Sequence, residues 1–253
     1  QSRQRRFDSD LSLKYIKMST SNKFQKIIRL LKDKIAFIWI SLIRDEEKKF
    51  NFIYKNKYWQ NIDNGSLSGA GSNIDDSTHN LSIELPNFIN KHQVKSLLDM
   101  PCGDWAWMSK LNLANIDYIG CDIVEDMITT NNQKYRNAKI NFIKKNLSHD
   151  DLPEADMILV RDLLVHLKYP DIILCLNNIK KYDYKYIAIT NFPKLVKNIN
   201  NKFGDRWRPI NFNLEPYFLP KPDFVLPDDS QIGEYDSQKT VAIWKNENFH
   251  GWS

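Results

Sequence analysis

The sequence predicts an α/β protein with a doubly wound, mostly parallel sheet. Short apolar runs alternate with amphipathic segments from residue 95 to residue 190. Strands that alternate with helices at this spacing form a parallel sheet with helices on both faces. A chain of 253 residues, of which 42% are hydrophobic, is long and apolar enough to bury such a core.

The elements follow one another in a regular order. A helix is expected over residues 79–93, before the sheet begins. The predicted strands are 95–99, 118–122, 139–143, 157–161 and 186–190. The helices expected between them are 104–112, 124–135, and one that follows the fourth strand to about Lys180. The alternation stops after Phe192 in a stretch rich in proline and aromatic residues, 203–230, and residues 240–244 predict a late antiparallel strand.

Cysteine usage and hydropathy indicate a cytoplasmic protein. The three cysteines, Cys102, Cys121 and Cys175, have no metal-like spacing, and their odd number argues against a disulfide framework. The longest apolar run, residues 35–43, is shorter than the roughly 20 residues that cross a bilayer. No secretory signal with a small-residue cleavage site is visible.

The positive charge is concentrated near the N-terminus. Residues 1–58 hold 15 Lys/Arg and 6 Asp/Glu, whereas residues 59–253 hold 21 and 25. Because phosphate contacts dominate the affinity of nucleic-acid-binding proteins, a mildly acidic body argues against a nucleic-acid substrate. We expect a basic N-terminal extension, residues 1–57, and a second domain, residues 58–253.

Residues 23–43 carry apolar side chains at helical spacing, with Lys and Arg on the other face. Two interpretations remain open. The helix packs on the main body, or it is a basic amphipathic helix on an anionic membrane surface. The second interpretation predicts peripheral membrane contact through residues 23–43.

Polar residues stand where four of the predicted strands end: Asp99, followed by Gly103 and Asp104; Asp122; Asn146; and Arg161-Asp162, followed by His166. Such ends lie side by side on one rim of a doubly wound sheet. An acid about 20 residues after a tight turn is placed to hold ribose hydroxyls, and Asp122 stands in that position after Gly103. A dinucleotide site needs more glycines than Gly103, and Trp105 crowds the place of a pyrophosphate. A cofactor without phosphates fits better.

Residues 58–73 hold three of the eight glycines of the chain, next to the aromatic pair Tyr58 and Trp59. Glycine lets a backbone approach a ligand closely. Two interpretations remain: a flexible linker, or a loop that folds over a cofactor.

Residues 60 to 245 resemble class I S-adenosylmethionine-dependent methyltransferases. The first motif is most similar to that of a subgroup often linked with surface-glycan synthesis. It reads Leu-Asp-Met-Pro-Cys-Gly-Asp-Trp-Ala-Trp-Met and covers residues 98–108. The other matching segments are 68–72, 118–123, 161–167 and 204–211. The resemblance implies a Rossmann-like fold with a seven-stranded mixed sheet and S-adenosylmethionine as cofactor.

The resemblance also implies the cofactor contacts. Asp99, Gly103 and Asp104 would face the methionine part. Asp122 would bind the ribose hydroxyls, and Asn146 with Leu147 would contact the adenine. The remaining positions implied for cofactor binding are Ser68, Gly69, Gly71, Ser72, Pro101, Cys102, Trp105, Ile123 and Arg161.

A sugar hydroxyl needs a general base, and His166 and Asp162 are the candidates. They stand four residues apart on what we expect to be an early helical turn, so they would face the same way. We favour His166 as the base, with Asp162 orienting it or the acceptor, and the reverse assignment stays open. Asp162 could also ligate Mg²⁺, but no second and third ligand is evident, so no metal site is expected.

Residues 203–217 are the candidate acceptor site. Trp207 offers a flat face, while Asp205, Arg208 and Asn211 offer hydrogen-bonding groups, a mixture that suits carbohydrate. The alternative is a structural cover for the sheet edge.

The resemblance implies O-methylation of a sugar hydroxyl in a surface polysaccharide or glycolipid, near a glycosyltransferase partner. Two alternatives remain: a methyltransferase for a small metabolite, protein or nucleic acid, and a non-catalytic cofactor-binding module that supports a glycosyltransferase.

Overall fold

The computed structural model describes residues 40, 42–59, 66–72, 78–113, 115–200, 207–228 and 239–251. The chain divides into two compact units, Gln1–Arg44 and Asp45–Ser253. Most of the predicted amphipathic helix over 23–43 lies outside the described residues. No helix in the ranges just given is both long and apolar enough to cross a membrane.

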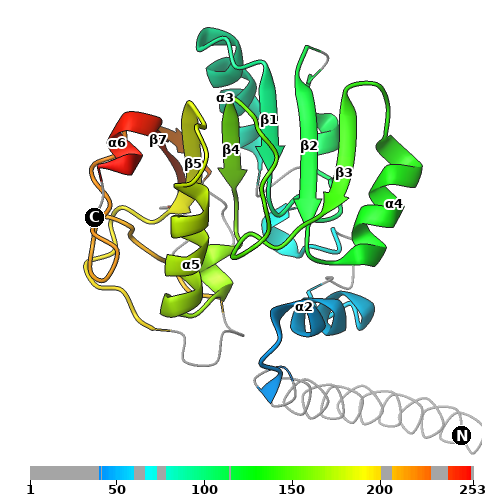
Figure 1. Cartoon of the computed structure of the whole chain (residues 1–253), viewed down its shortest axis with the longest axis horizontal. Coiled ribbons are helices and arrows are strands. Elements are labelled where there is room, and N and C mark those ends of the chain that lie inside the picture. The colour runs from blue at the N-terminus through cyan, green and yellow to red at the C-terminus, as the bar shows by residue number, and fades with distance from the viewer. Residues whose placement is uncertain are drawn as a thin grey trace, which may run out of the picture. The chain divides into compact units, whose positions relative to one another are not determined.

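A seven-stranded sheet in the order β3-β2-β1-β4-β5-β7-β6 forms the centre of this unit (Figure 1). Strands β1 to β5 run parallel, and β7 runs antiparallel to both of its neighbours. The strands are β1 (Ser96–Asp99), β2 (Asp117–Asp122), β3 (Ile140–Lys144), β4 (Met157–Val160), β5 (Tyr186–Asn191), β6 (Phe224–Pro227) and β7 (Thr240–Lys245). The mostly parallel, doubly wound sheet predicted from the sequence is confirmed.

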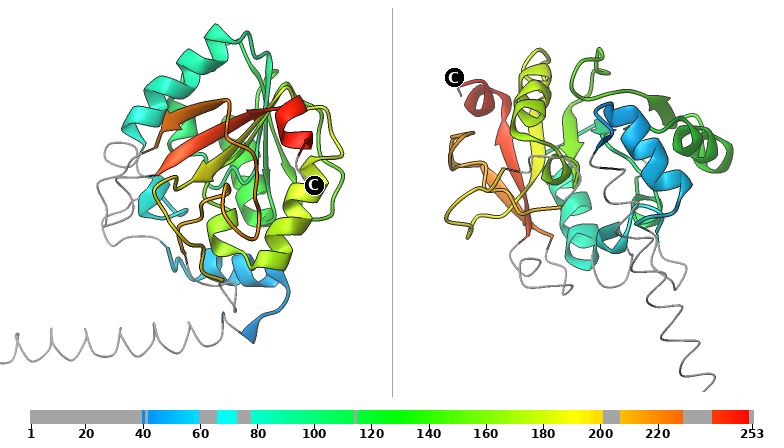
Figure 2. Two further views of the ribbon diagram at one scale, coloured as in Figure 1. Left: turned by 90° about the vertical axis from the view of Figure 1, so that its left-hand side faces the viewer. Right: turned by 90° about the horizontal axis from the view of Figure 1, so that it is seen from below.

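Helices cover both faces of the sheet, and Figure 2 shows α3 and α5 on opposite faces. The helices are α2 (Glu46–Lys55), α3 (His79–Lys91), α4 (Glu125–Tyr135), α5 (Tyr169–Ile179) and α6 (Asn246–His250), with the 3₁₀ turns η1 (Ala70–Ser72), η2 (Met108–Lys110) and η3 (Leu164–His166). Every residue of β4 is buried, which is the burial expected of a central strand covered on both faces.

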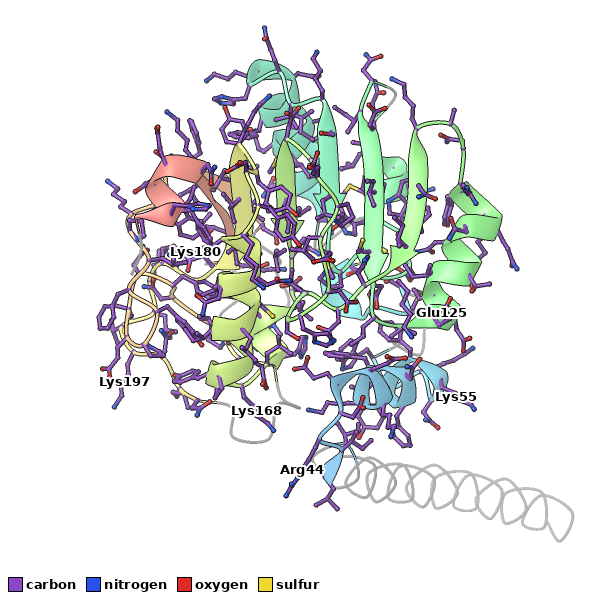
Figure 3. The ribbon with its side chains drawn as sticks, in the orientation of Figure 1. Arg44, Lys55, Glu125, Lys168, Lys180 and Lys197 are labelled. Atoms are coloured by element: carbon purple, nitrogen blue, oxygen red, sulfur yellow. The ribbon has the colours of Figure 1, made fainter. Side chains whose placement is uncertain are left out.

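Helix α2 belongs to the same compact unit as the sheet, although the sequence analysis assigned residues 1–57 to the extension. It lies beyond the carboxyl ends of the parallel strands (Figure 1). Asp45 caps its first turn by accepting a hydrogen bond from the Lys48 amide. At the end of β3, Lys144 Nζ lies 2.6 Å from Glu47 Oε1 and 3.8 Å from Glu125 Oε2, and Figure 3 shows Glu125 close to α2.

The helix expected over 104–112 is wrong. The chain makes turns there, followed by the short η2. The physical reason lies at Trp105, which has a left-handed backbone with φ +57° and is buried in the core, in ring contact with Tyr118, Tyr135 and Phe142. Burying this ring bends the backbone out of a helical path.

The expected helix after β4 is also corrected. Asp162 has φ +58°, η3 follows it, and α5 begins only at Tyr169, with Pro170 in its first turn. Asp162 and His166 therefore do not share a helical face. Strand β6 was not predicted, because its sequence Phe-Val-Leu-Pro lies within the proline-rich stretch.

Candidate active site

A pocket opens at the carboxyl ends of β1, β2 and β4, where ligands of open α/β sheets bind. It encloses about 700 Å³ including its mouth, a size typical of small-molecule sites. The structure brings many of the sequence-predicted residues together in its wall. These are Ser68, Ser72, Asp99, Pro101, Cys102, Gly103, Asp104, Asp122, Ile123, Arg161, Asp162 and His166.

The turn after β1 is shaped by Gly103. This residue has φ +53°, and a Cβ built on it would lie 2.3 Å from Ser68 Oγ. Only glycine combines that backbone conformation with so close an approach. The Gly103 amide donates to Asp122 Oδ2 at 3.1 Å, so the turn also holds the acid that ends β2.

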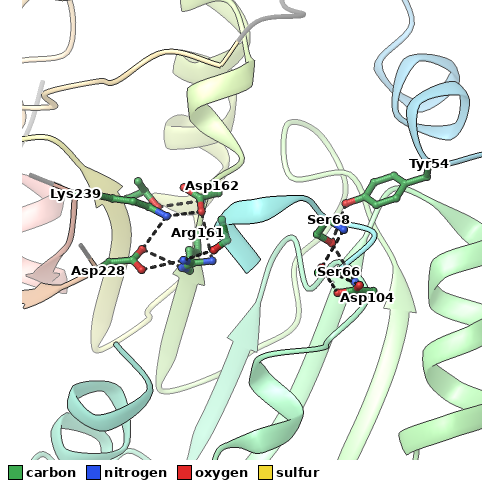
Figure 4. Close-up of polar contacts among 10 residues, drawn as sticks. Tyr54, Ser66, Ser68, Asp104, Arg161, Asp162, Asp228 and Lys239 are labelled. Atoms are coloured by element: carbon green, nitrogen blue, oxygen red, sulfur yellow. Dashed lines mark hydrogen bonds and ion pairs between the residues drawn. The ribbon is translucent and has the colours of Figure 1, made fainter. Parts of the chain in front are cut away.

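The loop 66–72 is fastened over this turn (Figure 4). The Asp104 carboxylate accepts hydrogen bonds from Ser66 Oγ at 2.8 and 2.9 Å and from the Leu67 amide at 2.7 Å. Ser68 Oγ accepts from the Asp104 amide at 3.2 Å and lies 3.2 Å from the Tyr54 hydroxyl of α2. Asp104 lines the pocket, but its carboxylate bonds the loop.

Two buried carboxylates end the neighbouring strands β1 and β2. Asp99 accepts a hydrogen bond from the Tyr118 hydroxyl at 2.6 Å, and Asp122 also accepts one from the Val124 amide at 3.0 Å. Burial raises the pKa of Asp99 to about 7 and that of Asp122 to about 6. Both acids therefore favour a ligand that brings hydrogen-bond donors or positive charge.

A buried ion cluster stands at the end of β4 and consists of Arg161, Asp162, Asp228 and Lys239 (Figure 4). Arg161 donates to both Asp228 oxygens at 2.8 and 2.9 Å, and to the Gly71 carbonyl at 2.8 Å. Its guanidinium carbon lies 5.0 Å from the centroid of the Trp107 ring. Arg161 thus holds the second end of the loop 66–72.

His166 lies beside Trp59, with ring centroids 4.8 Å apart and planes 30° apart. Burial lowers the pKa of His166 to about 4; the charge of Asp162 opposes this, and the charges of Arg208 and Lys239 reinforce it. The imidazole is therefore neutral near pH 7 and has a lone pair that can accept a proton.

A second hollow adjoins the first and shares five lining residues with it: Phe50, Pro101, Asp122, Ile123 and Leu163. Asn146 and Leu147 line it, together with apolar side chains that include Met100 and Leu163. The Asn146 side-chain oxygen accepts from the Ser148 amide at 2.9 Å and from its hydroxyl at 2.7 Å. This hollow suits a flat apolar ring.

The three predicted acceptor residues that the structure describes, Trp207, Arg208 and Asn211, do not line the pocket. Arg208 donates to the Ile199 and Val165 carbonyls at 2.8 and 2.9 Å. Asn211 donates to the Pro193 and Leu195 carbonyls at 3.2 and 3.0 Å. These contacts fit the structural alternative. Trp207 packs edge-on against Phe192, and Asp205 lies outside the described residues.

The loop glycines Gly69 and Gly71 and the buried Trp105 do not line the pocket either. Gly69 has φ +95° and packs near Trp59, and Gly71 acts through its carbonyl.

Several lining residues were missed: Phe50, Tyr54, Trp59, Trp107 and Leu163. Asp45 followed by two glutamates is a helix-start signal that could have revealed α2. In the Trp-Ala-Trp segment, both Trp105 and Trp107 are buried in the core, and Trp107 also lines the pocket. No local signal marks Asp228 and Lys239. Over the described ranges, no group of three or more His, Cys, Asp or Glu side chains could hold a metal ion.

Residues 98–182 match the family described as a methyltransferase domain. The fold around them is the Rossmann-like class I methyltransferase fold that the sequence analysis expected. Among curated proteins, no sequence is significantly similar to this chain.

Solved structures with a similar fold include three methyltransferases. The methyltransferase domain of bacterial CtHen1 has 11% identity and a TM-score of 0.49, covering 67% of this chain and 100% of that chain. Human N-acetylserotonin methyltransferase in complex with SAM has 12% identity and a TM-score of 0.48, covering 65% and 51%. The N-methyltransferase NodS from Bradyrhizobium japonicum WM9 has 13% identity and a TM-score of 0.47, covering 66% and 94%.

Proposed function

We propose that this chain is an S-adenosylmethionine-dependent methyltransferase that O-methylates a sugar hydroxyl of a surface polysaccharide or glycolipid. The observation that carries the methyl-donor part is the pair of buried carboxylates, Asp99 and Asp122, which end adjacent strands beneath the loop 66–72. The match of residues 98–182 to a methyltransferase domain supports it.

The residues present fit this cofactor. S-adenosylmethionine carries an ammonium group, a sulfonium centre and two ribose hydroxyls, and all of these favour ionised carboxylates nearby. The pKa of Asp99 and that of Asp122 are raised by burial, so both acids gain from such a ligand. The apolar hollow beside Ile123 and Leu147 suits the adenine ring.

The chemistry assigned to the protein is alignment and proton transfer. The bound cofactor supplies an electrophilic methyl group. Helix α2, Trp59 and the loop 66–72 cover the site and limit access of water. Neutral His166 would accept the proton of the acceptor hydroxyl, and the bound cofactor would supply the methyl group that the hydroxyl oxygen takes. Alignment can supply roughly 7–11 kcal/mol of the barrier, and a general base about 10²–10⁴-fold in rate.

The sugar acceptor is supported by the resemblance of the first motif and by the ring of Trp59 beside His166. A pyranose has an apolar face that packs on aromatic rings and hydroxyls that need polar partners. The link to polysaccharide or glycolipid synthesis rests on the resemblance.

The first test is cofactor binding by isothermal titration calorimetry. We expect the chain to bind S-adenosylmethionine and the Asp122→Asn variant to bind it at least about tenfold more weakly, because charged hydrogen bonds are worth about 1.5–3 kcal/mol. Asp117→Asn, at the exposed start of β2, is the matched control and should bind normally. A wild-type chain that does not bind the cofactor would overturn the proposal.

The second test is transfer of a labelled methyl group to sugar acceptors. We expect His166→Ala to lose transfer by about 10²-fold or more, and Asp162→Asn to lose it too, while both variants still bind the cofactor. Binding without transfer to any glycan would instead support a non-catalytic module. Transfer confined to small metabolites, proteins or nucleic acids would reject the sugar acceptor.

A further inference from the structure

The ion cluster joins segments that are far apart in the sequence. Lys239 Nζ lies 2.5 Å from Asp162 Oδ2 and 3.1 Å from Asp228 Oδ2, and Arg161 Nη1 lies 3.3 Å from Asp162 Oδ2. The side chains of Arg161, Asp228 and Lys239 are at most 4% exposed. Two positive and two negative groups therefore balance one another at the place where the ends of β4, β6 and β7 converge.

The two carboxylate oxygens of Asp162 have different contacts. Oδ2 forms ion pairs with both Lys239 and Arg161, whereas Oδ1 is buried and has no hydrogen-bond partner among the described residues. The backbone is held as well, because the Asp162 amide donates to Thr190 Oγ1 at 2.9 Å. A left-handed φ of +58° at a non-glycine residue costs energy and persists only when the surroundings enforce it.

Asp162 lines the pocket together with His166 and Asp99. Its Oδ1 is closed off by the protein, but the side chain as a whole is 23% exposed, so a hydrogen-bond donor in the pocket can approach the accessible part of the carboxylate. A hydroxyl of the acceptor molecule is such a donor.

On the basis of the proposed function, we propose that Lys239 and Asp228 are positioning residues. They fix Asp162 so that its carboxylate accepts a hydrogen bond from an acceptor hydroxyl next to the reacting one, while His166 takes the proton. The acceptor class that follows is a polyol with neighbouring hydroxyls.

The charge balance supports this division of roles. Burial alone would raise the pKa of Asp162, but the charges of Lys239 and Arg161 lower it below its ordinary value, and the neighbouring His166 acts in the same direction. A carboxylate held in its ionised form accepts hydrogen bonds strongly and takes up protons poorly. The charged groups around it are Arg161 directly after β4, His166 on η3, Asp228 directly after β6 and Lys239 directly before β7.

Carboxyl titration by nuclear magnetic resonance, on the full chain labelled at aspartate, tests the proposal without any methyl acceptor. We expect the pKa of Asp162 to rise by about one unit or more in Lys239→Met, because a close opposite charge shifts a carboxyl by about 1–3 units. Lys239→Arg should restore most of the shift. Lys185→Met, which removes an exposed ion pair with Asp156, is the control and should leave the Asp162 titration unchanged.

Steady-state kinetics then separate positioning from a purely structural role. In Lys239→Met we expect the KM for the sugar acceptor to rise about tenfold, the loss of roughly one hydrogen bond to a charged group. The acid limb of the kcat/KM profile should move to higher pH, and the affinity for S-adenosylmethionine should stay unchanged.

A Lys239→Met protein that folds with an unchanged Asp162 titration and an unchanged acceptor KM would overturn the proposal. If that variant does not fold, Asp228→Asn serves in its place: the loss of a nearby negative charge should lower the pKa of Asp162 further, and an unchanged titration with an unchanged acceptor KM would again overturn the proposal. Two results together would separate this proposal from the proposed function. If the Asp162 pKa rises in Lys239→Met but the wild-type chain transfers no methyl group, the proposed function is rejected and the positioning of Asp162 by Lys239 is retained.

Discussion

At the scale of single residues, the site depends on acids that the fold keeps away from water. Asp99 is 3% exposed, and its oxygen is reached by the Tyr118 hydroxyl. Such a group destabilises the protein when it is ionised and no ligand compensates it. The pocket therefore carries a cost in stability that a cationic ligand relieves.

This cost leads to a prediction for Asp99→Asn. Because the folded pKa of about 7 lies above the ordinary 3.8, the stabilising effect of the protonated acid is complete below pH 3.8 and is lost as the pH rises through 7. Asparagine stays neutral and can still accept from the Tyr118 hydroxyl. Urea unfolding at pH 8 should find the variant more stable by about 1 kcal/mol or more, although it binds the cofactor more weakly.

The same measurement below pH 3.8 provides the comparison, since the acid is then protonated in both the folded and the unfolded state and the two proteins should differ little. Asp117→Asn, which changes an exposed acid on β2, should leave the free energy of unfolding unchanged at both pH values. A loss of stability at pH 8 in Asp99→Asn would contradict the raised pKa.

At the scale of elements, the loop 66–72 is held at both of its ends by residues of the sheet rim. Asp104 bonds Ser66 and the Leu67 amide, and Arg161 bonds the Gly71 carbonyl. The resemblance implied that Asp104 faces the methionine part of the cofactor. The contacts of its carboxylate show that it fastens the loop that covers the site.

We therefore predict that Asp104→Ala releases one end of the loop. Stopped-flow fluorescence of the neighbouring tryptophans should show the cofactor dissociating about tenfold faster or more, because a charged hydrogen bond of about 1.5–3 kcal/mol is lost. Ser66→Ala should reproduce part of this effect, since it removes the partner hydroxyl. An unchanged dissociation rate in both variants would mean that the loop does not retain the ligand.

At the scale of the whole molecule, the compact unit Asp45–Ser253 contains the sheet, the pocket and α2. Two residues of α2, Phe50 and Tyr54, line the pocket. The boundary of the functional unit therefore lies before this helix.

Deletion of residues 1–44 should accordingly leave a folded protein that binds S-adenosylmethionine as the full chain does, when compared by calorimetry and thermal unfolding. Deletion of residues 1–57 should abolish binding, because it removes α2. If the segment 23–43 contacts membranes, sedimentation with anionic vesicles should be lost on deleting residues 1–44 and should weaken with added salt in the full chain. Normal binding by the 58–253 protein would show that α2 is dispensable.

The sequence by itself determined every strand except β6, the alternation of strands with helices and the polar residues at the strand ends, because apolar runs and tight turns are local properties. It also determined that Asp99, Asp122, Arg161 and His166 would meet at one rim, since parallel strands end on the same side. It did not reveal the partners of these groups. Only the tertiary structure decided that Lys239 and Asp228 hold Asp162, that Asp104 bonds a loop, and that Arg208 and Asn211 bond backbone carbonyls. Those contacts depend on which distant segments pack together. A hydrogen bond or ion pair between two such segments has no signal in the local sequence of either segment, so it cannot be predicted from the sequence pattern.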